Sequence, residues 1–383
     1  MVKLPENFIK TIYELLGNEA ESLIKALDLP PVISLRFNKR KPGAEFSDVS
    51  PVPWCKSGVY LKKRPEFIFD PLLHAGAYYV QDASSMIYET LITYLLGHFS
   101  KVSGSLQPAL NVLDLCAAPG GKTTAMINAL PDGSFITANE YSQKRVGALK
   151  ENLAKWGYPN VIVTNKDSSF YAGQTESFDI VAVDAPCSGE GMMRKEEAAR
   201  TQWTPQLVEQ CATLQREILL NAVKTVKPGG FLIYSTCTFN HKENEENAEF
   251  IADELGMIPF DPQFPSEWGI HKGIETSLPV YRFMPHITDG EGLFLAVFRK
   301  AGEWEPTAIS QKSIINPVPN FPTVDVDRST ALAYLRGESI NLSPDSPKGM
   351  VTITYKGLRL GEAKNIGSRA NNHYPKPWRI LKR

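Results

Sequence analysis

Residues 111–122 read NVLDLCAAPGGK, and this stretch decides the fold class. It predicts a strand over residues 111–116 that passes into a glycine-rich loop, and the loop opens a helix over residues 122–130. Glycines let a ligand approach the backbone closely, and the first turn of a helix offers free amide groups. The pattern favours a nucleotide-type cofactor at the edge of a parallel sheet.

Strands and helices alternate on the C-terminal side of this stretch. Further strands are expected at 135–140, 160–166, 179–184 and 230–236, and an antiparallel final strand at 293–299. The helices between them are expected at 142–156, 205–226 and 243–255. Compact strand–helix units of this kind are typical of an α/β, doubly wound, Rossmann-like domain.

The flanking regions differ from this domain, and 383 residues are enough for about two or three domains. Helical periodicity over 7–27, short strands with proline-rich turns, and a helix over 82–96 predict an N-terminal α+β region that ends in a polar linker at 97–108. A strand at 350–355 indicates a small β-rich domain. We expect an N-terminal extension, the α/β domain, a proline-containing linker and the β-rich domain at 1–109, 110–302, 303–324 and 325–383.

Three acidic residues stand at expected strand ends. Glu140 lies about 20 residues after the loop, where an acid accepts hydrogen bonds from the ribose hydroxyls of a nucleoside cofactor. Asp167 would meet an adenine amino group, and Asp184 ends the fourth strand. A lone acid at such a position is often a helix cap, but three together favour one crevice. Gly121-Lys122-Thr123 also fits the end of a P-loop, although Cys116 stands where that motif requires glycine.

Two cysteines directly follow neighbouring strands, Cys187 in DAPCSG (184–189) and Cys237 in STCT (235–238). Adjacent strands lie about 4.8 Å apart, so both thiols can face the cofactor crevice. A thiolate that adds to carbon 6 of cytosine makes carbon 5 a nucleophile toward an electrophilic methyl group. A second group must then remove the carbon 5 proton, and Asp184 could hydrogen-bond the base.

Other uses of the cysteines are less favoured. No Cys-x-x-Cys or His pair accompanies them, so we expect no metal site, and the irregular spacing of five cysteines is not a disulfide framework. Buried structural thiols are the alternative, and we assign Cys55, Cys116 and Cys211 to it. The residues leave open which of the crevice cysteines is the nucleophile, because DNA cytosine methyltransferases use a Pro-Cys nucleophile.

The formal charge of −1 hides an asymmetry. Residues 348–383 hold nine basic side chains against Glu362 alone, a net charge of +8, and residues 36–64 hold eight against two acids. Two basic regions favour binding of a polyanion. No apolar run approaches the roughly 18 residues of a membrane helix, and the N-terminus lacks the apolar core of a secretory signal. We therefore expect a cytoplasmic protein with no membrane partner.

With these motifs the chain resembles the Sun/Fmu family of RNA cytosine-C5 methyltransferases. The matching pieces over about residues 30–300 are LRFN (35–38), YVQDASS (79–85), CAAPGGK (116–122), DAPCSGEG (184–191) and STCT (235–238). The resemblance implies a class I methyltransferase fold, with Cys237 as nucleophile and Cys187 assisting its release. It also implies that S-adenosylmethionine is held by Cys116, Ala117, Ala118, Pro119, Gly120, Gly121, Lys122, Glu140, Asp167 and Asp184.

The substrate is expected to be RNA rather than DNA. Arg145 is a further candidate for cofactor binding. The loop at 190–203 contains Arg194, Lys195 and Arg200, and it is a candidate for covering the base and holding RNA phosphates. The segments at 355–364 and 372–376 resemble the C-terminal extension of the bacterial small-subunit rRNA enzymes of the F-type (YebU-like), which is similar to a PUA-like RNA-binding domain. Ribosomal RNA, free or in an assembled subunit, is the first expectation for a monomeric enzyme. Transfer RNA, or a non-catalytic role in ribosome assembly, is the alternative.

Overall fold

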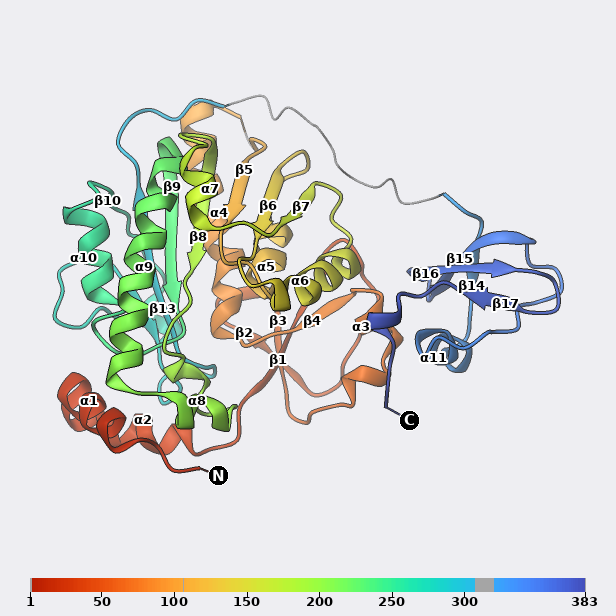
Figure 1. The fold of residues 1–383 in the computed structure, drawn as a ribbon, viewed down its shortest axis with the longest axis horizontal. Helices are drawn as coiled ribbons and strands as arrows, with labels where there is room; N and C mark the ends of the chain where they lie inside the picture. The colour runs from red at the N-terminus through yellow and green to blue at the C-terminus, as the bar shows by residue number, and fades with distance from the viewer. Residues whose placement is uncertain (1, 106, 307–319, 383) are drawn as a thin grey trace.

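The computed structural model describes residues 2–105, 107–306 and 320–382, and within these ranges the strands form three sheets (Figure 1). The N-terminal sheet has the order β2-β3-β1-β4, and its neighbouring strands are antiparallel. The elements of this region are α1 (Glu6–Leu16), α2 (Ala20–Leu27), β1 (Ile33–Phe37), β2 (Val49–Val52), β3 (Cys55–Leu61), α3 (Pro71–His74), β4 (Tyr78–Val80) and α4 (Ile87–Ser103).

The central sheet has the order β11-β12-β13-β9-β8-β5-β6-β7, and β10 also pairs with β13. Strands β9, β8, β5, β6 and β7 run parallel, while β13 is antiparallel to β9. The strands are β5 (Asn111–Asp114), β6 (Phe135–Asn139), β7 (Val161–Thr164), β8 (Phe178–Asp184), β9 (Val226–Thr236), β10 (Ile258–Pro259), β11 (His271–Lys272), β12 (Tyr281–Phe283) and β13 (Leu293–Arg299).

Helices cover both faces of the central sheet, and each face has its own apolar core. Buried residues of α4, α5 (Gly121–Ala129) and α6 (Gln143–Trp156) pack on one face. Residues of α7 (Ser168–Ala172), α9 (Pro205–Thr225) and α10 (Glu245–Asp253) pack on the other. Because β5, β6, β7, β8 and β9 are parallel, their carboxyl ends all lie at one edge of the sheet, where the crevice was expected.

Three details differ from the sequence-based prediction. The linker expected at 97–108 is wrong, because α4 continues through Gly97 to Ser103, and the buried Leu95 and Phe99 keep that turn on the core. The single helical stretch over 7–27 is divided by a short 3-10 turn at Gly17–Glu19, so that α1 and α2 change direction. Strands β10, β11 and β12 were missed, since two or three residues are too few to show periodicity.

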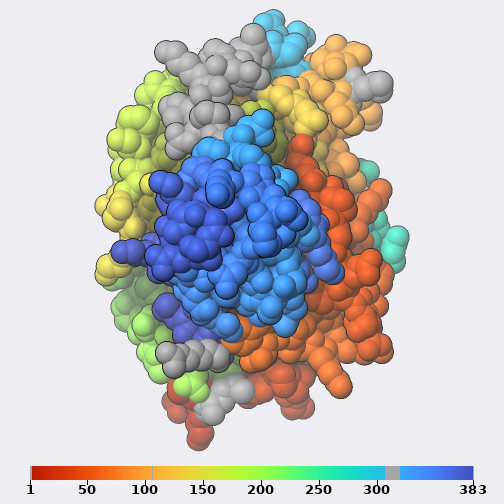
Figure 2. All heavy atoms as spheres, turned by 90° about the vertical axis from the view of Figure 1, so that its right-hand side faces the viewer, coloured from red at the N-terminus to blue at the C-terminus, as the bar shows by residue number. Residues whose placement is uncertain are grey.

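The C-terminal sheet contains β14 (Thr323–Asp325), β15 (Gly349–Tyr355), β16 (Leu358–Asn365) and β17 (Ala370–Asn372), with α11 (Arg328–Leu335) packed against it. Figure 2 shows this region, in blue, between N-terminal segments in orange and the central region in yellow and green. Ala75, directly after α3, joins its apolar core, and Arg328 donates to the Phe69 carbonyl at 3.0 Å. Most of the linker expected at 303–324 lies outside the described residues. No helix in the described ranges is long and apolar enough to span a bilayer.

Candidate active site

The ends of the parallel strands surround a cavity of 1020 Å³. Predicted site residues from five separate strand ends or following loops line it: Cys116, Glu140, Arg145, Asp167, Asp184, Cys187 and Cys237. The rest of the 116–122 loop lies beside this lining, with Lys122 connected to it through Asp184. The structure therefore brings both thiols and the acidic cofactor candidates to one crevice, with residues 117–122 of the loop next to it.

The two cysteines face each other. Cys187 Sγ lies 3.2 Å from Cys237 Sγ, and neither belongs to a disulfide. Their closeness follows from the sheet, because β8 and β9 are parallel neighbours with Asp184 opposite Ser235. The hydrogen bond with Cys237, together with burial, raises the pKa of the Cys187 thiol well above its usual value. Cys187 is therefore a neutral thiol at physiological pH and can donate or share a proton.

Lys122 and Asp184 form an ion pair beside the thiols. Lys122 Nζ lies 2.7 Å from Asp184 Oδ1, and Ser235 Oγ donates to the same oxygen at 2.7 Å. Burial acts to lower the pKa of Lys122, but Asp184 outweighs it and the pKa is raised. The charges of Lys122 and Asp184 thus lie next to the cysteines. A nucleobase bound against the cysteines would gain or lose charge at this place during the reaction.

The strand end at Glu140 fits a nucleoside cofactor. Glu140 Oε1 accepts from the Ser142 amide at 2.7 Å, whereas the buried Oε2 accepts no hydrogen bond from any described residue. Arg145 Nη1 lies 3.4 Å from that oxygen, and Arg145 also donates to the Ala118 carbonyl. A buried carboxylate oxygen without a donor is costly, so a hydroxyl of a ribose would satisfy it.

Asp167 also lines the cavity, but its exposed carboxylate caps a helix. Its Oδ1 accepts from the Ser169 amide at 2.9 Å at the start of α7, and the hydrogen bonds from Ser169 lower the pKa of Asp167. The helix-cap role and a contact with the cofactor are compatible, since a carboxylate has a second oxygen.

Arg36 anchors the start of the helix that follows the glycine-rich loop, a role that the sequence analysis missed. It is fully buried in β1 and donates to the Thr124 carbonyl at 3.1 Å, the Thr124 hydroxyl at 2.6 Å and Gln81 Oε1 at 2.8 Å. Thr124 lies in the first turn of α5, directly after the loop. The N-terminal sheet thus holds the start of α5 in place. The only signal in the sequence was the match of LRFN to the family.

Glu190 links the loops that carry the two cysteines. The fully buried Glu190 Oε2 accepts from the amides of Phe239 and Asn240 at 2.6 and 2.8 Å. The Gly191 amide donates to the Cys237 carbonyl at 2.8 Å, and a Cβ at Gly191 would come within 2.9 Å of that oxygen. Glycine is therefore required at 191 by the close approach of the Cys237 backbone.

The basic residues expected to hold RNA phosphates in the 190–203 loop have other partners. Arg194 and Lys195 pair with Glu291, each at 3.3 Å. Arg200 is buried, and it pairs with Asp28 at 2.9 Å and donates to three backbone carbonyls. This segment contains a 3-10 turn and α8 (Glu197–Gln202), and Arg200 joins it to the N-terminal helices, whereas Arg194 joins it to the loop before β13. The expectation of a phosphate-binding loop was wrong for Arg194 and Arg200.

Comparison with known proteins agrees with this geometry. A family model described as 16S rRNA methyltransferase RsmB/F matches residues 105–299, about half of the chain. The chain belongs to the RsmB/F family. Two further models, the N-terminal domain of 16S rRNA methyltransferase RsmF and the methyltransferase RsmF PUA domain, match residues 4–83 and 321–380. The protein is thus a family enzyme of the RsmF type, and the α/β methyltransferase fold and the S-adenosylmethionine cofactor expected from the sequence are confirmed.

Relatives match this RsmB/F enzyme over most of their length. Ribosomal RNA small subunit methyltransferase F of Pectobacterium atrosepticum is 34% identical, covering 96% of this chain and 81% of the relative. The Cronobacter sakazakii protein of the same name is 32% identical, covering 96% and 82%. A solved methyltransferase homolog from Pyrococcus horikoshii is 26% identical with a TM-score of 0.63, covering 77% and 95%. NSun6 from Pyrococcus horikoshii with SFG, 21% identical, shares the fold with a TM-score of 0.65, covering 78% and 98%.

Proposed function

We propose that this enzyme transfers a methyl group from S-adenosylmethionine to carbon 5 of a cytosine in 16S rRNA, with Cys237 as nucleophile. The observation that carries the proposal is the pair of thiols 3.2 Å apart on the wall of the cofactor crevice. The relatives named as small-subunit rRNA methyltransferases support rRNA over tRNA as the substrate. Free rRNA and rRNA in the assembled subunit are both candidate substrates for this reaction.

The two thiols divide the chemistry between them. The Cys237 thiolate adds to carbon 6 of the cytosine, forming an S–C bond and making carbon 5 nucleophilic. Carbon 5 then accepts the methyl group that S-adenosylmethionine supplies when it is bound. Cys187, after its thiol has given its own proton to solvent, accepts the carbon 5 proton, and the S–C bond breaks as the Cys237 thiolate leaves. Asp184, held by Lys122 and Ser235, hydrogen-bonds the ring nitrogen and the exocyclic amine as charge develops.

The proposed cofactor site uses the residues at the other strand ends. Glu140 would accept from the ribose hydroxyls and Asp167 from the adenine amino group. The backbone of Cys116, Ala117, Ala118, Pro119, Gly120, Gly121 and Lys122 would enclose the donor, with Arg145 orienting Glu140 and the Ala118 carbonyl. We further propose a monomeric, cytoplasmic enzyme in which the regions 1–109 and 325–383, which flank the catalytic domain (110–302) in the sequence, bind RNA. Strand β14 suggests that the C-terminal domain includes Thr323.

Substitution of each cysteine tests the assignment. Purified wild type should transfer a labelled methyl group to unmodified 16S rRNA or small subunits, and transfer RNA serves as the alternative substrate. Cys237→Ala should abolish transfer, and Cys187→Ala should accumulate a protein–RNA adduct that survives a denaturing gel. Cys211→Ala, which removes a thiol from α9, is the matched control and should keep activity. Full activity of Cys237→Ala would refute the assignment of the nucleophile.

A further inference from the structure

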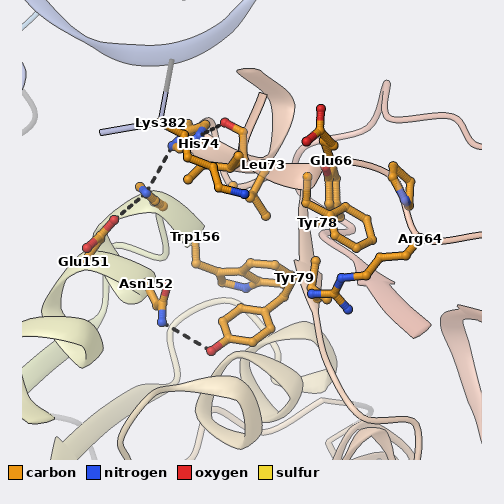
Figure 3. Close-up of a pocket in the computed structure, with 16 residues that line it drawn as sticks. Arg64, Glu66, Leu73, His74, Tyr78, Tyr79, Glu151, Asn152, Trp156 and Lys382 are labelled. Carbon is orange, nitrogen blue, oxygen red and sulfur yellow. Dashed lines mark hydrogen bonds and ion pairs between the residues drawn. The ribbon is translucent and has the colours of Figure 1, made fainter. Parts of the chain in front are cut away.

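A second cavity, of 710 Å³, lies at the other end of α6 from the thiol crevice (Figure 3). Arg145, near the start of α6, lines the crevice, whereas Asn152 and Trp156, near its end, line this second cavity. Arg145 and Asn152 are about 10 Å apart along the helix axis. The two cavities share no lining residue. The second cavity is therefore a separate site, although one helix connects the two.

Three parts of the chain form the second cavity. Figure 3 shows Arg64 and Glu66 on one side, Glu151 and Asn152 of α6 on the other, Tyr79 and Trp156 between them, and Lys382 above. The PUA-like C-terminal region therefore contributes directly to a site on the N-terminal and catalytic regions. A ligand bound there would contact all three parts at once.

The floor of the cavity is aromatic. Tyr79 is half-buried and presents part of its ring, and Trp156 lies beside it (Figure 3). Trp156 is only 2% exposed, and its indole Nε1 donates to no acceptor among the described residues. Trp156 is thus a buried part of the wall, with the Arg36 guanidinium 4.8 Å over its ring, and Tyr79 is the ring that a ligand can contact. A flat ring such as a nucleobase could stack on the accessible part of Tyr79.

The rim of the cavity carries cations. Arg64 and Lys382 are both exposed, and the Arg64 guanidinium lies 5.4 Å over the Phe67 ring. Lys155 is held by Glu151 at 2.5 Å and by His74 at 3.4 Å. Burial, with a contribution from Lys155, lowers the pKa of His74 to about 4, so this imidazole is neutral at physiological pH. Arg64 and Lys382 are thus the cations available to an anionic ligand.

We propose that this second cavity binds one unpaired nucleotide of the RNA substrate, with its base against Tyr79 and its phosphate near Arg64 and Lys382. The inference rests on RNA being the substrate, as proposed above. Proteins recognise single-stranded RNA by stacking bases on aromatic rings and placing basic side chains along the backbone. The cavity would fix the position of the RNA relative to the crevice at the opposite end of α6.

One hydrogen-bond chain connects the floor of this cavity to the cofactor loop. Asn152 Nδ2 donates to the Tyr79 hydroxyl at 3.2 Å and to the Pro119 carbonyl at 2.9 Å. Substitution of Tyr79 or Asn152 would therefore disturb the cofactor loop directly. Arg64 and Lys382, on the rim, avoid this complication and are the better positions for a test.

Ultraviolet crosslinking of the full-length protein to 16S rRNA tests the proposal without requiring methyl transfer. Mass spectrometry of the digested complex should find a nucleotide adduct on Tyr79. The adduct should fall at least about fivefold in Arg64→Glu/Lys382→Glu, because phosphate contact and stacking act together. Lys3→Glu/Lys101→Glu, the matched control with the same change in charge at two exposed lysines, should retain it. Adducts elsewhere on the chain with none in 64–82 or 151–156 would overturn the proposal.

Steady-state kinetics give the second readout. Arg64→Glu/Lys382→Glu should raise the KM for RNA by at least about fivefold and leave the KM for S-adenosylmethionine unchanged. An equal rise in the control pair would show a general charge effect and refute the subsite. The two proposals fail separately: crosslinking of Cys237→Ala reports on the second cavity even if methyl transfer proves to use another nucleophile.

Discussion

Glu190 and Glu243 are both fully buried, yet each accepts several hydrogen bonds from the loops that carry the cysteines. Glu243 accepts from the Ser188 amide at 3.0 Å, one residue after Cys187. Glu190 accepts from the amides two and three residues after Cys237. A buried carboxylate persists only when its acceptor sites are filled, so these contacts fix the backbone around both thiols. The geometry of the thiol pair depends on side chains that do not react.

Glu190→Gln tests this positioning role. Glutamine has one acceptor oxygen, whereas both oxygens of Glu190 accept: Oε2 from the Phe239 and Asn240 amides, and Oε1 from the Trp203 indole. An NH2 group in either place would face a donor, so the Cys237 loop should shift. We expect kcat to fall about 10- to 100-fold, because small displacements of a reacting group have effects of that size. The KM for S-adenosylmethionine should stay within about twofold, since Glu190 does not line the cofactor crevice.

The control for Glu190→Gln is Glu197→Gln, an exposed glutamate on α8. It should leave both kcat and KM unchanged. Trapping of RNA by Glu190→Gln in a Cys187→Ala background gives an independent readout, because a misplaced nucleophile should form less adduct. Wild-type kcat in Glu190→Gln would show that the loop is held by its other contacts.

Asp114 should give the protein an unusual dependence of stability on pH. Burial raises the pKa of Asp114 from its ordinary 3.8 to about 7, with Asp184 contributing in the same direction. Between these two values the unfolded chain has released this proton while the folded chain retains it. The contribution of Asp114 to the free energy of unfolding therefore falls as pH rises through that window and is constant above it.

Asp114→Asn removes this titration while keeping an acceptor for Thr123, which donates to Asp114 in the wild type at 2.6 Å. The stability of Asp114→Asn relative to the wild type should increase from about pH 4 to about pH 7, by on the order of a few kcal/mol. Urea unfolding at several pH values measures it. Asp253→Asn, at an exposed position on α10, controls for loss of a carboxylate. A difference that does not change with pH would contradict the prediction.

At the residue scale the sequence predicted which side chains line the crevice, but not the side chains that hold the surrounding backbone in place. Cys187, Cys237, Asp184 and Glu140 were found because strand ends of a parallel sheet meet at one edge. Arg36, Glu190 and Glu243 were missed, since a charged residue in a sequence gives no sign that it is buried. Arg200 was misinterpreted for the same reason.

At the element scale, β1 and α5 are joined by Arg36 across the boundary between the N-terminal and central sheets. Arg36 also lies over the Trp156 ring at 4.8 Å, so it contacts α6 as well. Burial lowers the pKa of Arg36 to about 10, and the guanidinium remains charged at neutral pH. A charge buried without a close carboxylate needs all of its hydrogen bonds, which makes this junction sensitive to substitution.

Arg36→Lys tests the junction. A lysine keeps the charge but cannot reproduce the planar set of donors to Thr124 and Gln81. We expect the free energy of unfolding to fall by about 3 kcal/mol. The KM for S-adenosylmethionine should rise, because α5 follows the cofactor loop directly. Lys56→Ala, at an exposed position on β3, is the control for a basic residue of the same sheet. An unchanged KM would mean that the loop keeps its shape without Arg36.

The elements that were predicted well are the long, periodic ones. Helices α6 and α9 and strand β13 lie within a residue or two of the expected bounds, since each carries an apolar pattern over its length. Gly97 was interpreted as a break, but tertiary packing of Leu95 and Phe99 holds the helix through it. Strand β12 owes its pairing to β13, a contact that local sequence does not show.

At the scale of the whole molecule, the asymmetric charge should determine how strongly RNA binding depends on salt. Residues 348–383 have a net charge of +8 in a chain of −1. Lys348, Lys356 and Lys364 are exposed on or next to β15 and β16. Cations on this surface would release counterions from the RNA on binding, so the affinity should fall steeply as salt rises.

The triple variant Lys348→Gln/Lys356→Gln/Lys364→Gln tests this prediction. Each lysine that contacts a phosphate should reduce the slope of log affinity against log salt by about one. The variant should therefore bind 16S rRNA more weakly at low salt, with a slope lower by about one to three, while its affinity for S-adenosylmethionine is unchanged. Lys3→Gln/Lys10→Gln/Lys101→Gln removes the same charge from exposed positions on the N-terminal region. Filter binding over a range of salt measures both, and equal slopes in the two variants would place the RNA elsewhere than on the C-terminal sheet.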